Sequence, residues 1–384
     1  MQDLPKRLKK KIENRTSENA LRSMGAQNNL IDFSSNDYLG FSTNSNIFKR
    51  ASELLKEHHL EQNGATGSRL LSGNHSLYAI AETAIASFHN VEEALIFNSG
   101  YDANLGFFSA IPQRGDLIFF DELCHASIRD GIAMSNAKSY KFTHNNLEDL
   151  KAKCQLEHNR NLSNETEVYV VTESVFSMDG DSPDLTALAH FCQEQGFHLI
   201  IDEAHALGAI GSNGEGLIQH FELEHLVFAR LVTFGKALGC HGAAILGSNA
   251  LKTYLINFAR SFIYTTALPP HSVATILAAY EHLQSKPSEI KKIHSNIAIL
   301  HNKLTTHQLH HLFVPSSTAI QCCILPGNEH VKQIAQALQK EGIDVKAILS
   351  PTVPQGQERL RICLHSFNTE EEIKQLALLM TNLL

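Results

Sequence analysis

The feature that most constrains the fold is the alternation of strand-like and helix-like runs between residues 75 and 246. Short apolar runs such as Leu117 to Phe120, Val168 to Thr172 and Leu199 to Ile201 are separated by stretches with the length and pattern of helices. Strands that alternate with helices in this way predict a mainly parallel sheet. Because the strands are apolar throughout, we expect helices on both faces of the sheet. The predicted fold class is therefore α/β.

The pattern divides the chain into three parts. We expect an N-terminal segment at 1–45, a large domain at 46–290 and a small α+β domain at 291–384 that packs with the N-terminal segment. The expected helices are 5–24, 76–89, 100–109, 126–136, 146–156, 184–195, 287–308, 329–341 and 370–384. The expected strands are 93–97, 116–121, 138–143, 168–172, 198–202, 226–234, 243–246, 319–325, 344–349 and 359–364.

Composition excludes several classes of protein. A net charge of −8 argues against a nucleic-acid partner. The cysteines total seven, with no Cys-x-x-Cys pair, which favours reduced thiols in the cytoplasm. No apolar run reaches about 18 residues, so we expect no membrane span. The histidine groups at 58–59 and 307–311 lack nearby cysteines or paired carboxylates, so we expect no metal site.

Several polar side chains fall where predicted strands end. Ser99, Asp121, Glu173, Asp202 and Lys236 all take such positions. In parallel sheets, ligands bind at the carboxyl ends of the strands. The shared placement predicts one site, and it carries more weight than any single residue.

Lys236 and Asp202 are the pair with the most specific chemistry. Lys236 lies between Gly235 and small residues, so a flat molecule could approach its amine closely. An enzyme that holds pyridoxal phosphate needs a lysine for the aldehyde and a carboxylate for the pyridinium nitrogen. This predicts a pyridoxal-phosphate site. The alternative for each residue taken alone is an ordinary surface position after a strand.

Other residues near the strand ends could complete the site. Ser99, Gly100 and Tyr101 start a predicted helix, whose amides can bind a phosphate. Thr233 offers a hydroxyl to the same phosphate, and His125 could stack on a planar ring. Each of these residues could also be purely structural, as a helix cap or a loop residue. Phosphate-binding motifs of the Gly-x-x-x-x-Gly-Lys and Gly-x-Gly-x-x-Gly types are missing from the expected places.

Taken together, the motifs resemble the α-oxoamine synthases, which are pyridoxal-phosphate enzymes with the aspartate-aminotransferase fold (fold type I). The resemblance covers nearly the whole chain in order. It is carried by Phe33-Ser-Ser-Asn-Asp-Tyr-Leu-Gly40, Gly73-Asn-His75, Ser99-Gly-Tyr101, Thr172 to Asp181, Asp202-Glu-Ala-His205, Thr233 to Gly239 and Pro351-Thr-Val-Pro354. Length and motifs are most similar to the member that condenses L-alanine with a pimeloyl thioester, on acyl carrier protein or coenzyme A, in biotin biosynthesis.

The resemblance implies roles for individual residues. Lys236 would hold the cofactor and move the substrate α-proton, Asp202 would keep the pyridine nitrogen protonated, and His125 would stack on the ring and orient substrate. The remaining implied cofactor contacts are Ser99, Gly100, Tyr101, Ser177, His205, Thr233, Thr265 and Thr266. The threonine segment would come from the neighbouring subunit, which implies a homodimer.

The resemblance also implies a substrate site made of Arg22, Asn36, His125, Thr352 and Arg361. Arg361 would hold the amino-acid carboxylate, which a planar guanidinium binds through two parallel hydrogen bonds. Leu349 departs from the pattern, because the biotin enzyme commonly carries an arginine there. This departure leaves the acyl chain and its carrier open.

Alternatives therefore remain within the family and outside it. Another member could condense glycine with an acetyl or succinyl thioester, or could make an aminoketone signal. A non-catalytic member could keep the fold as a binding module. The presence of Lys236, Asp202 and His205 together argues against the binding module.

Overall fold

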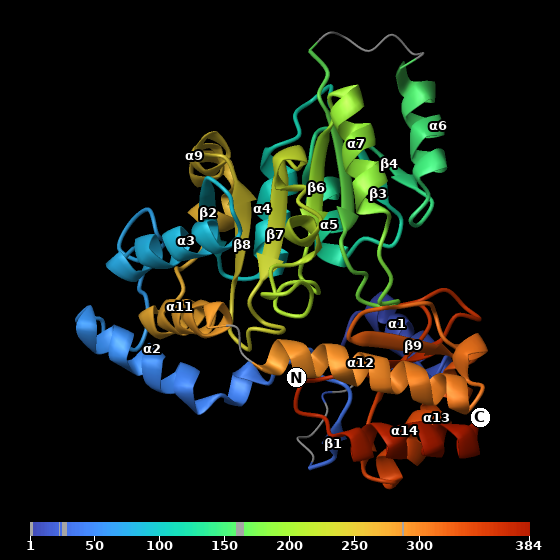
Figure 1. Ribbon diagram of the computed structural model, residues 1–384. Helices are drawn as coiled ribbons and strands as arrows, with labels where there is room; N and C mark the ends of the chain where they lie inside the picture. The colour runs from blue at the N-terminus through green and yellow to red at the C-terminus, as the bar shows by residue number, and fades with distance from the viewer. Residues whose placement is uncertain (1–2, 23, 25–28, 159–164, 286–287) are drawn as a thin grey trace. The chain divides into compact units, whose positions relative to one another are not determined.

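A computed structural model of the chain describes residues 3–22, 24, 29–158, 165–285 and 288–384 (Figure 1). The chain forms two compact units. One contains residues 36–177 and 182–291, and the other contains residues 1–35, 178–181 and 292–384. The boundary after Lys291 falls inside helix α12 (Ser288–Thr306).

The larger unit is built on a mixed sheet. Within its described residues the sheet has seven strands in the order β2-β8-β7-β6-β5-β3-β4. The strands are β2 (Glu93–Phe97), β3 (Leu117–Asp121), β4 (Lys138–Phe142), β5 (Val168–Glu173), β6 (His198–Asp202), β7 (Ala229–Thr233) and β8 (Ala243–Gly247). Strand β8 runs antiparallel to both β2 and β7, while β7, β6, β5, β3 and β4 run parallel to one another. The prediction of a mainly parallel sheet is confirmed.

Helices cover the sheet of this unit. They are α2 (Ser45–Glu57), α3 (Ser76–Phe88), α4 (Gly100–Ala110), α5 (Ala126–Met134), α6 (Leu147–His158), α7 (Leu185–Gln195), α8 (Leu217–His220), α9 (Asn249–Phe258), α10 (Arg260–Ile263) and α11 (Pro270–Gln284). Short 3-10 turns occur at η1 (Phe41–Thr43) and η2 (Glu224–Leu226). Among the described residues, no helix has both the length and the apolar composition of a membrane span.

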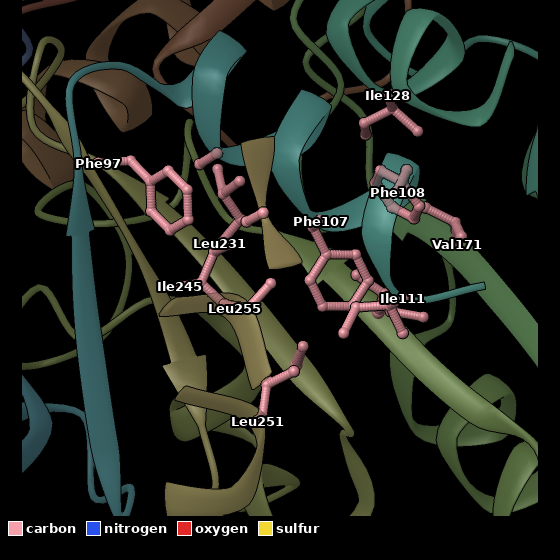
Figure 2. Packing of buried hydrophobic residues seen from close by; sticks show 14 of the residues in the cluster. Phe97, Phe107, Phe108, Ile111, Ile128, Val171, Leu231, Ile245, Leu251 and Leu255 are labelled. Atoms are coloured by element: carbon pink, nitrogen blue, oxygen red, sulfur yellow. The ribbon is translucent and has the colours of Figure 1, made fainter. Parts of the chain in front are cut away.

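A single apolar cluster holds α4 against the sheet (Figure 2). Phe107 and Phe108 of α4 are at most 2% exposed and pack with Leu231 of β7 and Ile245 of β8. Burying an aromatic side chain of this size contributes about 1.5–3 kcal/mol. Because α4 cannot shift on the sheet without opening this cluster, its N-terminus has a defined position beside the strand ends.

The smaller unit contains two further sheets. Strands β11 (Lys346–Ile348), β12 (Arg359–Cys363) and β9 (Ile320–Ile324) form an antiparallel sheet, and β1 (Ile31–Asp32) pairs in parallel with β10 (Ile343–Asp344). The helical elements are α1 (Lys6–Ser17), η3 (His310–Leu312), α13 (Asn328–Lys340), α14 (Glu370–Leu383) and part of α12. The pairing of β1 with β10 joins the N-terminal segment to the C-terminal part of the chain.

Three predicted boundaries were wrong. The first helix ends at Ser17 rather than at 24, because Asn19 has a φ of 49°, which a continuing right-handed helix does not allow. The predicted strand 344–349 is two strands, since β10 pairs with β1 and β11 pairs with β12. The predicted strand 226–234 begins only at Ala229, because residues 224–226 form a 3-10 turn.

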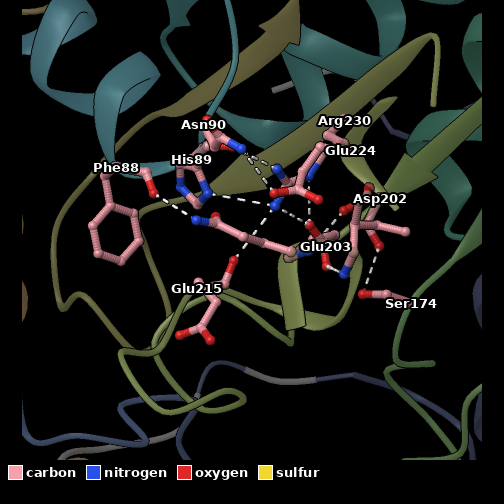
Figure 3. Close-up of polar contacts among 12 residues, drawn as sticks. Phe88, His89, Asn90, Ser174, Asp202, Glu203, Glu215, Glu224 and Arg230 are labelled. Carbon is pink, nitrogen blue, oxygen red and sulfur yellow. Dashed lines mark hydrogen bonds and ion pairs between the residues drawn. The ribbon is translucent and has the colours of Figure 1, made fainter. Parts of the chain in front are cut away.

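A buried ion pair joins Glu203, which directly follows β6, to Arg230 near the start of β7 (Figure 3). Arg230 Nε donates to Glu203 Oε2 over 2.8 Å, and the two residues are 2% and 0% exposed. The guanidinium also donates to the carbonyl oxygens of His89 and Glu215, and Glu203 Oε1 accepts from the Ile218 amide. The pair is thus surrounded by hydrogen bonds that offset the cost of burying two charges.

We predict that Arg230→Met lowers the free energy of unfolding by about 3–5 kcal/mol, because it leaves Glu203 buried without its cation. Urea titration followed by circular dichroism measures the change. Arg50→Met is the control, since Arg50 pairs with Glu281 and Glu57 on the surface of the same unit and its side chain is 34% exposed. The control should cost about 0–1 kcal/mol. Equal losses in the two variants would contradict the prediction.

Candidate functional site

The site lies at one edge of the large sheet, where the chain leaves several strands. Strands β3, β5, β6 and β7 end there, and antiparallel β8 begins there, since Thr233 at the end of β7 pairs with Ala243 at the start of β8. A cavity of about 250 Å³ opens at this edge. Its lining residues are Asn36, Ser99, Gly100, Tyr101, Asn104, His125, Ser127, Glu173, Asp202, Ala204, His205, Thr233, Gly235, Lys236, His241 and Gly242.

Asp202 is the buried carboxylate of the cavity. It is 6% exposed, and its two oxygens have different partners. Oδ2 accepts from the side-chain amide of Asn104 over 2.9 Å, and Oδ1 accepts from the backbone amide of Ala204 over 3.0 Å. Two donors therefore hold the carboxylate in one orientation.

A chain of hydrogen bonds connects Asp202 to His125. Asn104 Nδ2 donates to Ser127 Oγ over 3.0 Å, and Ser127 Oγ lies 2.7 Å from His125 Nδ1. The Ser127 amide also donates to Nδ1, over 3.2 Å, so Nδ1 is an acceptor. The neutral ring of His125 therefore carries its proton on Nε2.

His205 and Tyr38 form a second polar pair. The Tyr38 hydroxyl lies 2.7 Å from His205 Nδ1 and also donates to Asn36 Oδ1 over 3.3 Å. Tyr38 is 0% exposed and His205 is 6% exposed, so the pair is almost fully removed from bulk water. Because Nδ1 is bound to Tyr38, the ring of His205 has a defined orientation beside the cavity.

The N-terminus of α4 borders the cavity, since Ser99, Gly100 and Tyr101 are among its lining residues. The Ser99 side chain caps the helix by accepting from the Asp102 amide over 3.0 Å. Gly100 must lack a side chain, since a Cβ there would lie 2.6 Å from Thr233 Cγ2. The first amides of a helix and its positive dipole end bind phosphate well. The methyl group of Thr233 faces the same helix start, and its hydroxyl donates to the Ala204 carbonyl over 3.4 Å.

Burial and neighbouring charges shift the pKa values of Glu173 and His125. Burial and the negative charge of Asp202 raise the pKa of Glu173, whose Oε1 accepts from the His125 amide over 2.5 Å. Loss of solvent lowers the pKa of His125; the charge of Asp202 opposes this shift, while that of Lys236 adds to it. The site therefore favours a neutral imidazole at position 125.

The cavity brings together most of the predicted cofactor residues. Those among its lining are Ser99, Gly100, Tyr101, His125, Asp202, His205, Thr233 and Lys236, with Asn36 from the predicted substrate set. Ser177, Thr265 and Thr266 belong to the same unit but are not among the lining residues.

The other predicted substrate residues belong to the smaller unit. There, Arg22 Nη2 donates to Thr352 Oγ1 over 3.1 Å, so two residues predicted to contact the substrate also contact each other. Arg361 is 7% exposed and its Nη1 donates to Cys363 Sγ over 2.8 Å. These three residues remain predictions as substrate contacts.

Sequence reasoning missed Asn104, Ser127 and Tyr38 as parts of the site. Asn104 lies one helical turn after Gly100, and that spacing places both on one face of α4. Ser127 follows His125 by two residues, and Tyr38 lies within the recognised 33–40 motif. The sequence does not show which polar residues these three contact, and the hydrogen bonds of the folded chain do.

Comparison with known proteins agrees with this geometry. Residues 28–378 match the sequence profile of the family described as aminotransferase class I and II. The chain belongs to this family. Among its relatives, 8-amino-7-oxononanoate synthase of Emericella nidulans is 40% identical over 363 residues, covering 89% of this chain and 86% of the relative. The enzyme of the same name from Lysinibacillus sphaericus is 36% identical over 341 residues, covering 89% and 85%.

Solved structures place this aminotransferase-family chain among the α-oxoamine synthases. Serine palmitoyltransferase of Sphingomonas wittichii has a TM-score of 0.90 and 26% identity, covering 100% of this chain and 98% of that one. 8-Amino-7-oxononanoate synthase of Francisella tularensis has a TM-score of 0.75 and 29% identity, covering 92% and 97%. A serine palmitoyltransferase solved with pyridoxal phosphate has a TM-score of 0.85 and 28% identity, covering 92% and 87%. The predicted fold-type I architecture and cofactor class are confirmed.

The residues of the cavity fit pyridoxal phosphate. An amine and a buried carboxylate line the same cavity, and the start of α4, whose first amides could bind a phosphate, borders it. Lys236 would hold the aldehyde end, Asp202 the ring nitrogen, and the start of α4 the phosphate.

We predict that Tyr38→Phe weakens binding of pyridoxal phosphate about fivefold, which corresponds to one hydrogen bond of about 1 kcal/mol that orients His205. Absorbance titration of the apoenzyme gives the dissociation constant. Tyr78→Phe is the control, because its hydroxyl donates to the Leu268 carbonyl over 3.3 Å and it is not among the cavity's lining residues. If the control weakens binding as much as Tyr38→Phe, the effect is not specific to His205.

Proposed function

We propose that this chain catalyses the decarboxylating condensation of L-alanine with a pimeloyl thioester to give 8-amino-7-oxononanoate in biotin biosynthesis. The observation that carries the proposal is that Lys236 and Asp202 line one cavity with the start of α4. The names of the relatives at 36–40% identity support the choice of this reaction within the family.

The residues of the cavity have different roles in the proposed reaction. Pyridoxal phosphate, when bound, supplies the electron sink that makes the α-carbon of an amino acid acidic. Asp202 would hold a proton at the pyridine nitrogen, and the hydrogen bond from Asn104 fixes the orientation of its carboxylate. The Lys236 amine takes and returns the proton at the substrate α-carbon. His125, with its proton on Nε2, donates to the substrate and covers one face of the site.

The further contacts are also part of the proposal. His205 and Ser177 meet the phenolic oxygen of the cofactor, and Ser99, Gly100, Tyr101 and Thr233 bind its phosphate. Arg361 binds the carboxylate of alanine through its planar guanidinium, and Arg22, Asn36 and Thr352 contact the substrate.

We further propose a cytoplasmic homodimer. Thr265 and Thr266 would reach the phosphate bound by the partner subunit. Tyr264 beside them is 74% exposed, as expected for a segment that a second copy covers.

A second candidate function is a different condensation by the same machinery. The similarity to serine palmitoyltransferases, at TM-scores of 0.80 to 0.90 and 25–28% identity, supports a reaction with another amino acid and a longer acyl chain. Leu349 stands where the biotin enzyme commonly has arginine, which is compatible with such a chain. Glycine with an acetyl or succinyl thioester is the remaining variant of this candidate.

The lysine role predicts a spectroscopic result. The purified holoenzyme should absorb visible light, and Lys236→Ala should lose that absorption and at least about 10³-fold in turnover, because one group provides both the covalent link and the proton transfer. Lys49→Ala is the control, since Lys49 is exposed on α2. A variant at 236 that keeps both properties would overturn the assignment.

The substrate assignment predicts a ranking of amino acids. With a pimeloyl thioester, L-alanine should give carbon dioxide and a product of the mass of 8-amino-7-oxononanoate, and glycine and serine should react more slowly. Product mass spectrometry measures this, and growth of a biotin-requiring strain blocked at this step tests it in cells. Faster product formation with serine and a palmitoyl thioester would favour the second candidate instead.

A further inference from the structure

Helix α1 is a positively charged surface on an acidic protein. Its twelve residues include six basic side chains, Lys6, Arg7, Lys9, Lys10, Lys11 and Arg15, and a single acidic one, Glu13. None of its residues is buried, whereas the chain as a whole has a net charge of −8. An acidic partner would therefore be repelled by the average charge of the molecule and attracted to this helix.

The same helix exposes two apolar side chains on one face. Leu8 and Ile12 are four residues apart, which places them on one face of a helix, and they are 46% and 45% exposed. Leu4, just before the helix begins, is 50% exposed as well. Basic side chains flank these residues, so α1 offers both charge and a narrow apolar contact, as a surface for another protein does.

Hydrogen bonds within the smaller unit connect the end of α1 to the predicted substrate residues. Asn328 Nδ2 donates to the Glu18 carbonyl over 3.1 Å, and Asn328 Oδ1 accepts from the Ser350 amide over 2.9 Å. Two residues beyond Ser350, Thr352 accepts from Arg22 over 3.1 Å. The basic helix is thus held beside the chain segment that carries Arg22 and Thr352.

We propose that α1 is the docking surface for an acidic acyl carrier protein that delivers the thioester substrate. This inference rests on the proposed function and names the carrier, which the sequence leaves open. The carrier's acidic helix would lie along the basic side chains and touch Leu4, Leu8 and Ile12. Docking beside Arg22 and Thr352 brings the thioester of the carrier to the segment that contacts the substrate.

Two other ligands are less well matched by the helix. Coenzyme A is anionic, but its phosphates cover a small area and need no exposed leucine or isoleucine. A membrane would require a wider apolar face than three aliphatic side chains, since most of α1 is charged. Kinetics with the two thioesters and a vesicle-binding measurement distinguish these ligands from the carrier protein.

The test uses the holoenzyme with Lys9→Glu, Lys10→Glu and Lys11→Glu together. Glutamate in the first half of a helix suits its dipole, so α1 should persist, and circular dichroism checks this. The matched control reverses three other exposed lysines, Lys49, Lys291 and Lys292. Steady-state kinetics with L-alanine compares the pimeloyl thioester of acyl carrier protein with that of coenzyme A.

We expect the α1 variant to raise KM for the carrier-protein thioester and to lower kcat/KM about tenfold or more, with less difference from wild type at high salt. With the coenzyme A thioester, kcat/KM should stay within about twofold, because this small ligand does not cover α1 and only the protein partner loses its contacts with the helix. The control variant should keep both values. The variant Leu8→Ser with Ile12→Ser should likewise raise KM for the carrier-protein thioester alone.

Several outcomes would overturn the proposal. If the α1 variant loses kcat/KM equally with both thioesters, α1 serves the substrate or the coenzyme and not the carrier protein. If the control variant loses as much kcat/KM as the α1 variant, the net charge of the protein explains the effect. Binding to vesicles of phosphatidylglycerol and phosphatidylcholine that the α1 variant loses, with unchanged carrier kinetics, would assign α1 to a membrane. If the wild type turns over neither thioester, the proposed function fails. Calorimetric titration with the carrier protein then measures docking directly. Equal dissociation constants for the wild type and the α1 variant would overturn the docking proposal.

Discussion

The site depends on the buried ion pair between Glu203 and Arg230. Glu203 directly follows Asp202 at the end of β6, and Arg230 lies in β7, which leads to Lys236. The Glu203 amide also donates to the Leu231 carbonyl over 2.7 Å, so both side chain and backbone join the two strands. With Glu203 held this way, Asp202 and Lys236 leave neighbouring strands at the same edge of the sheet, as the cavity requires.

A second layer of hydrogen bonds orients the side chains once the strands are in place. Asn104 on α4 and Ser127 on α5 link Asp202 to His125, so one chain of contacts ties two helices to β6. The packing of Phe107 and Phe108 explains why α4 can serve this purpose, since a helix anchored in the core can present an amide to a buried carboxylate without shifting. Asn104 and Phe108 are one helical turn apart, so core packing and site chemistry use neighbouring positions on the same face of the helix.

The two compact units contribute different kinds of residue. The larger unit contains the residues that fit pyridoxal phosphate, while the smaller one contains Arg22, Thr352 and Arg361, for which we propose substrate roles. Pairing of β1 with β10 explains how Arg22, from the start of the chain, comes to contact Thr352 near its end. The charged helix α1 belongs to this second unit, which is consistent with a role in delivering substrate rather than cofactor.

The sequence by itself determined the α/β class, the order of the strands and helices, and the position of Lys236 and Asp202 at strand ends, because apolar periodicity and strand-end polar residues are local signals. It also determined the family, through motifs that keep their order. Only the tertiary structure decided that Asn104 and Ser127 link Asp202 to His125 and that Tyr38 binds His205, since these contacts join residues up to 167 positions apart. The break between β10 and β11 was likewise decided by pairing with different partners. Local sequence carries no information about which distant strand or side chain becomes a neighbour, and that choice is made by packing.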